Sequence, residues 1–414
     1  MSSGNENEIR ACRVCMRAEL QPILSLGATP LANALVRQED LDQIDPIYPL
    51  DLVLCPHCSL VQITETVPPE VLFREYAYFS SFSDTMLEHS RDLVEHLIRS
   101  RALSPESLAV EVASNDGYLL QYFQSAGVPV LGIEPAINIA KVAEEKGIAT
   151  LAEFFDDDLA MHLSREGRLA DVLIANNVLA HVANLHGFVE GVRILLKPGG
   201  TGVFEAAYVR DMIEYCEFDQ VYHEHLCYYS LTALSHLFDQ HELCVVDVER
   251  IPVHGGSLRV YVEHSDAAVS GHRVAELLME EQAWGVLDKD SYSGFADRVR
   301  HRRQAILDLL ADLKRRGQRI VGYGAAAKGS ILLNTFGIDG DTLDYVVDRS
   351  THKQGLYMPG THLPICAPER LLEDKPDYVL MLAWNFADEI LEQQAEYRKL
   401  GGQFIIPIPE LRIL

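Results

Sequence analysis

The chain has 414 residues, 48% of them hydrophobic and 23% charged, which predicts a globular protein of roughly two to four domains. Its 61 acidic and 35 basic residues leave a net charge of −26, which argues against a nucleic-acid partner because phosphate binding needs clustered Lys and Arg. The segment MSSGNENEIR lacks an apolar core and no apolar run approaches about 18 residues, so we expect no signal peptide, no membrane span and a cytoplasmic protein.

The first predicted feature is a metal site made of two C-x-x-C pairs. ACRVC supplies Cys12 and Cys15, and LCPHC supplies Cys55 and Cys58. Where thiols are kept reduced, such pairs are more often Zn²⁺ ligands than disulfides. Four thiolates leave no open coordination position, so we expect a structural Zn²⁺ that holds a small domain together. His57 lies inside the second pair and is a competing ligand.

The next predicted feature is a strand–loop–helix–strand unit. The apolar run at 108–112 predicts a strand, and the loop ASNDG and an amphipathic helix follow it. A second apolar run at 128–133 predicts a strand that ends at Glu134. An acidic residue in this place is typical of folds that hold a ribose with carboxylate oxygens. The unit therefore predicts a nucleoside site at the ends of these strands.

The loop of this unit favours S-adenosylmethionine over a dinucleotide. It offers Ala113 and Gly117 but not the full G-x-G-x-x-G, so a pyrophosphate fits poorly. A buried strand at 172–175 then ends at two asparagines, and a helix ends in the turn KPGG before a strand at 202–205. This order resembles Rossmann-like methyltransferases, and an α/β domain for another ligand stays open. The candidate cofactor-binding residues are Glu111, Asn115, Gly117, Glu134 and Asn176.

The segment YHEH, from Tyr222 to His225, concentrates titratable side chains. Three interpretations remain open: an acid–base site, a second metal site, and a pair of structural histidines. A metal is the poorest fit, because residues two apart do not face each other on a helix and Glu224 would point away on a strand. His225 is the candidate base because an imidazole titrates close to the operating pH.

The C-terminal part predicts a second unit of the same kind. Apolar residues at helical spacing predict a long helix over 295–313, whose basic run is most often a solvated face. RIVGYGAAAKG then predicts a strand, a small-residue loop and a helix, and the next strand ends at Asp348. Lys328 in this loop suits a phosphate, and an exposed lysine without a ligand is the alternative. Later strands are predicted within YVLMLAW and QFIIPIP.

Together these motifs resemble those of a known family. The cysteine quartet, the loop EVASNDG, the segment YHEH, the run HGGSLRVY and the loop GYGAAAKG occur in this order. They resemble the C-methyltransferases of deoxysugar biosynthesis, which act on dTDP-linked 4-keto sugars in antibiotic pathways, in particular those that branch C-3 on the way to tetronitrose and kijanose. The resemblance covers nearly the whole chain and departs at Ala113, where many methyltransferase loops carry glycine.

The resemblance implies an α/β protein in three parts. These are a zinc-binding domain at 1–68, a Rossmann-like class I methyltransferase domain at 69–285, and a second Rossmann-like domain at 286–414 that contributes to binding the dTDP-sugar. The resemblance also implies that His225 acts on the sugar, with Tyr222, Glu224, His181 and Tyr76 nearby. The candidate substrate-binding residues are Tyr78, Asn177, Lys328, Arg298 and Trp384. Packing is the alternative for the aromatic stretch with Tyr76 and for Trp384, and a monomer is expected.

The implied reaction makes specific demands on these residues. A C–H bond beside a ketone can lose its proton if the enolate oxygen is stabilised, and the enolate carbon can then take a methyl group from S-adenosylmethionine. We therefore expect a C-3 methyltransferase of a dTDP-linked 4-keto deoxysugar, with a 3-amino-2,3,6-trideoxy sugar as the first candidate. Two alternatives remain: an O- or N-methyltransferase of a small natural product, and a non-catalytic nucleotide-binding zinc protein.

Overall fold

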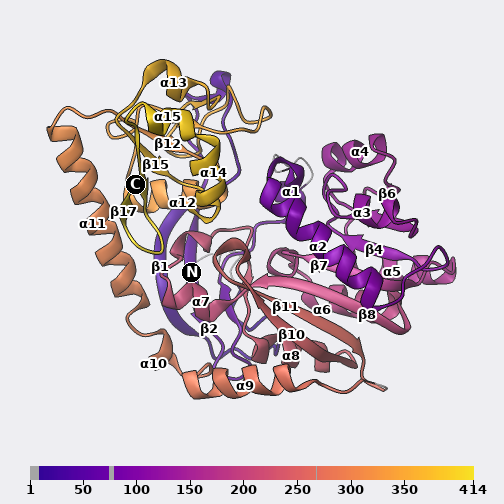
Figure 1. Ribbon diagram of the computed structural model, residues 1–414. Helices are drawn as coiled ribbons and strands as arrows, with labels where there is room; N and C mark the ends of the chain where they lie inside the picture. The colour runs from indigo at the N-terminus through magenta and orange to yellow at the C-terminus, as the bar shows by residue number, and fades with distance from the viewer. Residues whose placement is uncertain (1–8, 74–78, 267) are drawn as a thin grey trace.

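The computed structural model describes residues 9–73, 79–266 and 268–414. The strands in this part of the chain form three sheets, one for each part expected from the sequence (Figure 1). The predicted α/β class is confirmed, with a cysteine-rich N-terminal part followed by two Rossmann-like sheets.

The N-terminal sheet is antiparallel and has the strand order β1-β2-β3-β9. Its first strands are β1 (Gln21–Pro30), β2 (Ile47–Leu54) and β3 (Val61–Ile63). The last strand, β9 (Cys227–Tyr228), comes directly after the YHEH segment and pairs with β3, with Tyr228 opposite Val61. Backbone hydrogen bonds therefore join the cysteine-rich part to the segment that carries the candidate base.

The middle sheet has the strand order β10-β11-β8-β7-β4-β5-β6. The strands from β8 to β6 are parallel, and β11 runs antiparallel to both of its neighbours. Because β4 has β5 on one side and β7 on the other, the winding reverses at β4, and open α/β sheets bind ligands at the carboxyl ends of strands at such a point. The strands are β4 (Ala109–Val112), β5 (Val130–Ile133), β6 (Thr150–Leu151), β7 (Ala170–Asn176), β8 (Leu196–Ala207), β10 (Leu243–Ile251) and β11 (Ser257–His264).

Polar side chains start several of the helices around this sheet. Ser83, Asp156, Asn184 and Ser230 each accept a hydrogen bond from the backbone N–H three residues further on, which satisfies a donor that the helix itself leaves free. The helices begun in this way are α2 (Asp84–Ser100), α5 (Asp157–Arg165), α6 (Leu185–Leu195) and α8 (Leu231–Asp239). The others in this region are α1 (Pro69–Phe73), α3 (Leu120–Ser125), α4 (Ile137–Glu145) and α7 (Val209–Glu214).

The predicted KPGG turn is not separate from the strand that follows it, which corrects the sequence-based expectation. Helix α6 ends at Leu195, and β8 already begins at Leu196. The register between β7 and β8 shifts in this region, from Ala170 opposite Leu196 to Val172 opposite Thr201. Gly199, at a φ of +80°, lets the chain bulge there without leaving the strand.

The C-terminal sheet has the order β14-β13-β12-β15-β16-β17, parallel except for β17. Its strands are β12 (Ile320–Tyr323), β13 (Val346–Val347), β14 (Ile365–Cys366), β15 (Tyr378–Met381), β16 (Gln403–Ile406) and β17 (Arg412–Ile413). Its helices are α12 (Ala327–Phe336), α13 (Arg370–Asp374), α14 (Ala387–Gln393) and α15 (Ala395–Lys399). The strands predicted within YVLMLAW and QFIIPIP are thus present as β15 and β16.

Three helices connect the middle and C-terminal sheets: α9 (His272–Trp284), α10 (Lys289–Tyr292) and α11 (Phe295–Arg315). Helix α11, orange in Figure 1, runs along the outside of the molecule toward the C-terminal sheet. It confirms the long helix predicted over 295–313 and buries Phe295, Val299, Ile306, Leu310 and Leu313 on one face.

Short 3-10 helices carry several residues used below: η1 (Gln38–Asp40), η2 (Ser80–Phe82), η3 (Leu179–His181), η4 (Phe218–Gln220), η5 (Val253–Gly255) and η6 (Trp384–Phe386). The largest core cluster contains side chains of all three parts, such as Leu52, Phe204 and Val346. The domain boundaries expected after residues 68 and 285 therefore stay a prediction, and the hydrophobic core is continuous across them. Among the described residues, none of the helices combines the length and the apolar composition that crossing a membrane requires.

Candidate active site and metal centre

A cavity of about 640 Å³ lies where the three parts of the molecule meet. Its wall includes residues that follow β4, β5 and β7, at the carboxyl ends of the middle sheet, as expected for an open α/β fold. The N-terminal part contributes Asn33, and the C-terminal part contributes Lys328, Lys353 and Phe386. The cavity has the size of a typical small-molecule site.

The loop after β4 turns sharply beside this cavity. Ala113, Asn115 and Gly117 have φ angles of +53°, +49° and +77°. This left-handed conformation favours glycine, so the alanine at 113 adopts it at a cost of about 1 kcal/mol. Ala113 and Asn115 line the cavity, whereas Gly117 packs against Ile148, to which an added Cβ would come within 2.8 Å.

Glu134 lies at the end of β5, where the sequence predicts a ribose-binding acid. One of its oxygens accepts the backbone N–H of Asn115 at 2.9 Å, and the other accepts that of Ala136 at 2.8 Å. Burial raises the pKa of Glu134 to about 7, although these two N–H groups oppose the shift. Glu134 lines the cavity, and its oxygens have lone pairs left for ligand hydroxyls.

Of the other predicted cofactor residues, Asn176 lines the cavity and Glu111 lies outside its wall. Asn176 is the last residue of β7 and Asn177 follows it, and both line the cavity. The Oδ1 atom of Asn176 is buried and has no hydrogen-bond partner among the described residues, so it can accept a bond from a ligand. Glu111 lies beneath the loop, outside the cavity wall, and is 1% exposed. Burial raises the pKa of Glu111 well above its ordinary value.

His225 reaches the cavity with its protonation pattern set by its neighbours. Its Nδ1 atom lies 3.0 Å from the carbonyl oxygen of Gln220, so Nδ1 carries the proton that this bond needs. In the neutral ring Nε2 is then the acceptor, and the hydroxyl of Tyr222 donates to it at 2.7 Å. His225, Tyr222 and Gln220 all line the cavity. The arrangement presents a basic nitrogen and a phenol side by side.

His181, on η3, lies against this pair. Its ring centre is 4.8 Å from that of His225, at an angle of 69° between the rings. Burial lowers the pKa of His181 to about 4, so its imidazole is neutral near pH 7. A neutral imidazole can donate a hydrogen bond to a developing oxygen anion without being a strong acid. Tyr76 and Tyr78, expected near this cluster, lie outside the described residues.

The other two residues of YHEH point toward the N-terminal part. Both carboxylate oxygens of Glu224 accept hydrogen bonds from Nδ2 of Asn33, at 2.7 and 3.0 Å. Asn33 lines the cavity and Glu224 does not. His223 is buried, and its Nε2 atom lies 3.2 and 3.1 Å from the carbonyl oxygens of Tyr48 and Pro49. His223 therefore has a packing role at the interface with the N-terminal sheet.

The predicted substrate residues of the C-terminal part differ in their positions. Lys328 lines the cavity, but it is 8% exposed and its ammonium lies 4.6 Å from the ring centre of Trp384. Trp384 lies behind the wall and donates from Nε1 to Asp219 at 2.6 Å. Arg298 is exposed, lies outside the cavity wall and donates to the carbonyl of Ile213 at 2.9 Å.

The structure adds residues that the sequence did not single out. Asn33 has no motif around it and reaches the site only because the N-terminal part folds over the cavity. Gln220 acts through its backbone carbonyl, which any residue could supply. Lys353 and Phe386 line the wall from the loop after β13 and from η6. One feature of the sequence could have pointed to Lys353 and Phe386: both follow predicted parallel strands, and open α/β sheets bind ligands at the ends of such strands.

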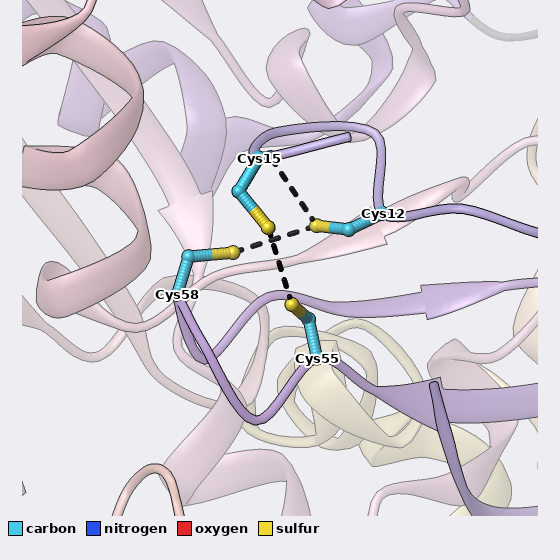
Figure 2. Close-up of side chains that lie close together, drawn as sticks. All are labelled: Cys12, Cys15, Cys55 and Cys58. Atoms are coloured by element: carbon cyan, nitrogen blue, oxygen red, sulfur yellow. Dashed lines mark hydrogen bonds between the residues drawn. The ribbon is translucent and has the colours of Figure 1, made fainter. Parts of the chain in front are cut away.

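The cysteine quartet forms a compact metal centre (Figure 2). The four Sγ atoms lie within 4.8 Å of one another, close to the spacing of about 3.8 Å that a tetrahedral Zn²⁺ with bonds of about 2.3 Å requires. Among the described residues, this is the only group of three or more potential ligand side chains gathered closely enough to share an ion. The geometry thus fits the predicted structural zinc and gives no support to a second metal at YHEH.

Both cysteine pairs fold into the same turn. The residue after each pair, Met16 and Ser59, has a φ of +61° and donates its N–H to the carbonyl of the first cysteine at 3.0 Å. The turn aims both thiols of a pair at one point. His57 instead points outward, with Nδ1 3.1 Å from Arg17 and Nε2 in contact with Glu19, so it is not a fifth ligand.

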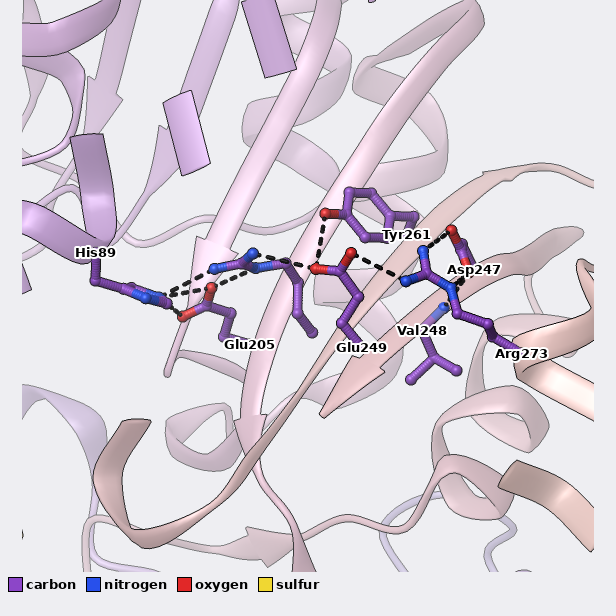
Figure 3. A network of polar contacts seen from close by, with 8 residues as sticks. His89, Glu205, Asp247, Val248, Glu249, Tyr261 and Arg273 are labelled. Carbon is purple, nitrogen blue, oxygen red and sulfur yellow. Dashed lines mark hydrogen bonds and ion pairs between the residues drawn. The ribbon is translucent and has the colours of Figure 1, made fainter. Parts of the chain in front are cut away.

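A chain of charged side chains braces the middle sheet behind the cavity (Figure 3). His89 of α2 and Arg259 of β11 both contact Glu205 at the end of β8, at 2.9 and 2.7 Å. Arg259 continues to Glu249 at 3.2 Å, and Glu249 to Arg273 at 3.2 Å. Burial alone would raise the pKa of Glu205, but His89 and Arg259 outweigh it and the net pKa is lowered.

Family models match three stretches of the chain. A zinc binding domain matches residues 12–73, a methyltransferase domain matches residues 86–248, and a C-methyltransferase C-terminal domain matches residues 252–409. The C-methyltransferase NovU of Streptomyces niveus is 36% identical over 410 residues, which are 98% of this chain and 97% of that protein.

Solved structures show weaker similarity. A protein from Pyrococcus horikoshii OT3 aligns with a TM-score of 0.36 at 13% identity, over 47% of this chain and 97% of that chain. Magnesium protoporphyrin IX methyltransferase from Synechocystis aligns with a TM-score of 0.34 at 13% identity, over 44% of this chain and 82% of that chain. Scores of this size support no statement about the substrate of this chain.

Proposed function

The chain belongs to a family of S-adenosylmethionine-dependent C-methyltransferases with zinc-binding, methyltransferase and C-terminal domains, and on this basis we propose that it methylates C-3 of a dTDP-linked 4-keto deoxysugar. The first candidate substrate is a 3-amino-2,3,6-trideoxy sugar. The antibiotic pathway belongs to the same proposal and rests on the motif resemblance, while the cytoplasmic location stays the expectation drawn from the amino-acid sequence. The observation that carries it is the pair formed by His225 and Tyr222 at the cavity wall.

The proposed role of His225 is to remove the proton from C-3. Nδ1 is occupied by the carbonyl of Gln220, so Nε2 is the nitrogen that can accept a proton from the cavity side. The hydroxyl of Tyr222 now bonds to Nε2. An enolate oxygen is a charged and therefore stronger acceptor, so it can draw that hydroxyl away as the proton moves. His181 is the second residue expected at the same oxygen, although its neutral imidazole has one N–H and also hydrogen-bonds the backbone of Glu224.

The pair of Asn33 and Glu224 is proposed to orient the sugar. Because Glu224 is 3% exposed and bonds to Asn33, the amide of Asn33 is the group that faces the cavity. Glu224 then acts by holding this amide in place. If the substrate carries an amine at C-3, the negative charge behind Asn33 favours it. This assigns to the N-terminal part a share in substrate recognition.

The residues around the loop after β4 suit the methyl donor. Glu134 can accept ribose hydroxyls, and the buried Oδ1 of Asn176, without a partner among the described residues, can accept a ligand donor. When bound, S-adenosylmethionine supplies an electrophilic methyl group. The four cysteines would hold a structural Zn²⁺ away from the reacting atoms, because their thiolates complete its coordination.

Deuterium exchange tests this function. The enzyme, incubated in D₂O with a dTDP-4-keto sugar and no methyl donor, should exchange the hydrogen at C-3, because deprotonation comes before methyl transfer. An O- or N-methyltransferase has no need to break that bond. His225→Asn should slow the exchange ~10²–10⁴-fold, the usual worth of a positioned base, while binding of S-adenosylmethionine stays unchanged. Methylation at carbon by the His225→Asn variant at the normal rate would contradict the assignment.

A further inference from the structure

A buried ionic cluster lies between the C-terminal part and the segment that precedes YHEH. Asp219 of η4 is 0% exposed, Glu217 is 2% exposed and Lys328 of α12 is 8% exposed. Charged side chains are rarely buried to this extent, because leaving water costs several kcal/mol per ion. Replacing such a cluster by apolar side chains is often neutral for stability. The cluster therefore invites an explanation other than stability.

The C-terminal part contacts η4 at two of its residues. Trp384 donates from Nε1 to Oδ2 of Asp219 at 2.6 Å, and the ammonium of Lys328 lies against the same indole ring. The ring of Phe218 stacks on Phe336 of α12, with centroids 4.7 Å apart. Burial raises the pKa of Asp219 to about 6, and Lys328 opposes this shift. The lysine thereby favours a charged Asp219 near neutral pH.

The next residue of η4 connects this cluster to the candidate base. The carbonyl of Gln220 accepts hydrogen bonds from Nδ1 of His225 at 3.0 Å and from the hydroxyl of Tyr228 at 3.1 Å. The side-chain amide of Gln220 also contacts Glu217. One peptide unit separates Asp219 from this carbonyl, so a displacement of Asp219 moves the group that orients His225.

We propose that Asp219, held by Trp384 and Lys328, is a positioning residue for proton abstraction. It keeps the carbonyl of Gln220 on Nδ1 of His225 and so leaves Nε2 as the proton acceptor. The inference rests on the proposed function, in which His225 removes the proton. It assigns to the C-terminal part a role in the chemistry at a distance from the reacting carbon, in addition to any contact with the substrate.

Two substitutions of increasing severity test the proposal. Trp384→Phe keeps an aromatic ring beside Lys328 but removes the N–H that Asp219 accepts and part of the buried indole, whereas Asp219→Asn removes the charge. We expect C-3 deuterium exchange to slow ~3–10-fold in the first variant and ~10–100-fold in the second, the range expected when a catalytic group is misplaced. Trp284→Phe, at the chain's other tryptophan, is the matched control and should exchange like the wild type.

A pH profile separates positioning from a general loss of structure. Among the described residues, the titratable side chains whose rings lie against His225 are Tyr222, His181 and Tyr228. A carbonyl on Nδ1 and a negative charge nearby both favour the protonated imidazole. In Asp219→Asn the acid limb of kcat/KM should therefore move to lower pH, while the affinity for S-adenosylmethionine stays the same. A merely structural defect lowers the rate at every pH without moving the limb.

The outcomes of these experiments distinguish the positioning role of Asp219 from the proposed function on which it rests. If the wild type exchanges deuterium and both variants match it in rate and pH profile, the positioning role is overturned and the proposed function stands. If the wild type neither exchanges the C-3 hydrogen nor methylates carbon, the proposed function fails and the positioning role fails with it. Should Asp219→Asn not fold, the rate and profile of Trp384→Phe decide, since this change removes the hydrogen bond to Asp219 and leaves its carboxylate in place.

Discussion

The middle and C-terminal sheets use the same device at their first two strands. In the middle sheet, Glu134 after β5 accepts the N–H of Asn115 in the preceding loop and that of Ala136, two residues on. In the C-terminal sheet, Asp348 after β13 accepts the N–H of Ala325, at 2.7 Å, and that of Ser350, two residues on, at 2.8 Å. In both, an acid at the second strand's end fastens the loop of the first.

The two sheets differ in what lies beyond this loop. The middle loop borders the cavity of about 640 Å³, with the buried Oδ1 of Asn176 beside it. The C-terminal loop also reaches this cavity, at Ala326 and Ala327, and bounds a second cavity of about 120 Å³, and the first helical turn there carries Lys328 into the cluster with Asp219. The same local fold therefore borders the large cavity in both halves, and in the C-terminal half it also places a lysine in a buried ionic cluster. The acid at the strand end alone does not predict this difference.

Removing the zinc tests the N-terminal part, which contacts both the middle part and the C-terminal part. The N-terminal sheet includes β9 of the middle part, and the carbonyl of Ala32 accepts a hydrogen bond from Ser330 of α12 at 2.8 Å. Cys12→Ser should lose Zn²⁺ and unfold or precipitate, because a structural metal contributes folding energy directly. Metal content and circular dichroism measure this. A zinc-free variant with normal structure and activity would show that the two halves hold together without it.

The chain of ion pairs in Figure 3 stabilises the middle sheet. The side chain of Arg259 is 11% exposed and pairs with the buried Glu205, whereas that of Arg273 is 43% exposed. Arg259→Ala should lower the free energy of unfolding by ~3–5 kcal/mol, because it removes the guanidinium that pairs with a buried carboxylate. Arg273→Ala should cost less than ~1 kcal/mol. Urea denaturation measures both, and equal losses would contradict a buried brace.

Exchanging the two strand-end acids for amides sharpens the comparison. Glu134→Gln should raise KM for S-adenosylmethionine ~10–100-fold, since hydrogen bonds to a charged group are worth about 1.5–3 kcal/mol. Asp348→Asn should leave that KM within about twofold, because Asp348 lies on the wall of the smaller cavity. Steady-state kinetics with a fixed sugar substrate measure both variants. Similar effects on KM would mean that the donor also depends on the C-terminal half.

The pH dependence of stability gives a further test of Glu134. Burial raises the pKa of Glu134 from 4.5 to about 7 in the folded protein. Between these values the folded chain keeps a proton that the unfolded chain releases, so the free energy of unfolding falls as pH rises through this window. Between pH 5 and pH 8 the share of Glu134 is roughly 2–3 kcal/mol and should be missing in Glu134→Gln. Urea denaturation of both proteins at pH 5 and pH 8 measures the difference.

Much of the fold could be predicted because its signals are local. Two C-x-x-C pairs predict a metal centre, since each pair folds into the same short turn whatever surrounds it. The apolar runs that end at Glu134 and Asp348 predict two strands, because a strand whose two faces are both buried needs a continuous run of apolar residues. The sequence likewise predicts that Lys328 lies in a loop at the start of a helix, but it does not predict which side chains surround Lys328. A phosphate contact was the expectation for a lysine at a helix start and stays a prediction, and the structure places Lys328 close to Asp219 as well.

The amino-acid sequence by itself determined the elements of this protein: the cysteine turns, the two strand–loop–helix units and a histidine suited to proton transfer. Only the tertiary structure decided which of them work together. Asn33 meets Glu224 across 191 positions, and Trp384 meets Asp219 across 165. Such contacts depend on how buried surfaces of separate parts fit, which no local pattern records. The tautomer of His225 likewise follows from a backbone carbonyl that the fold, and not a side chain, brings to it.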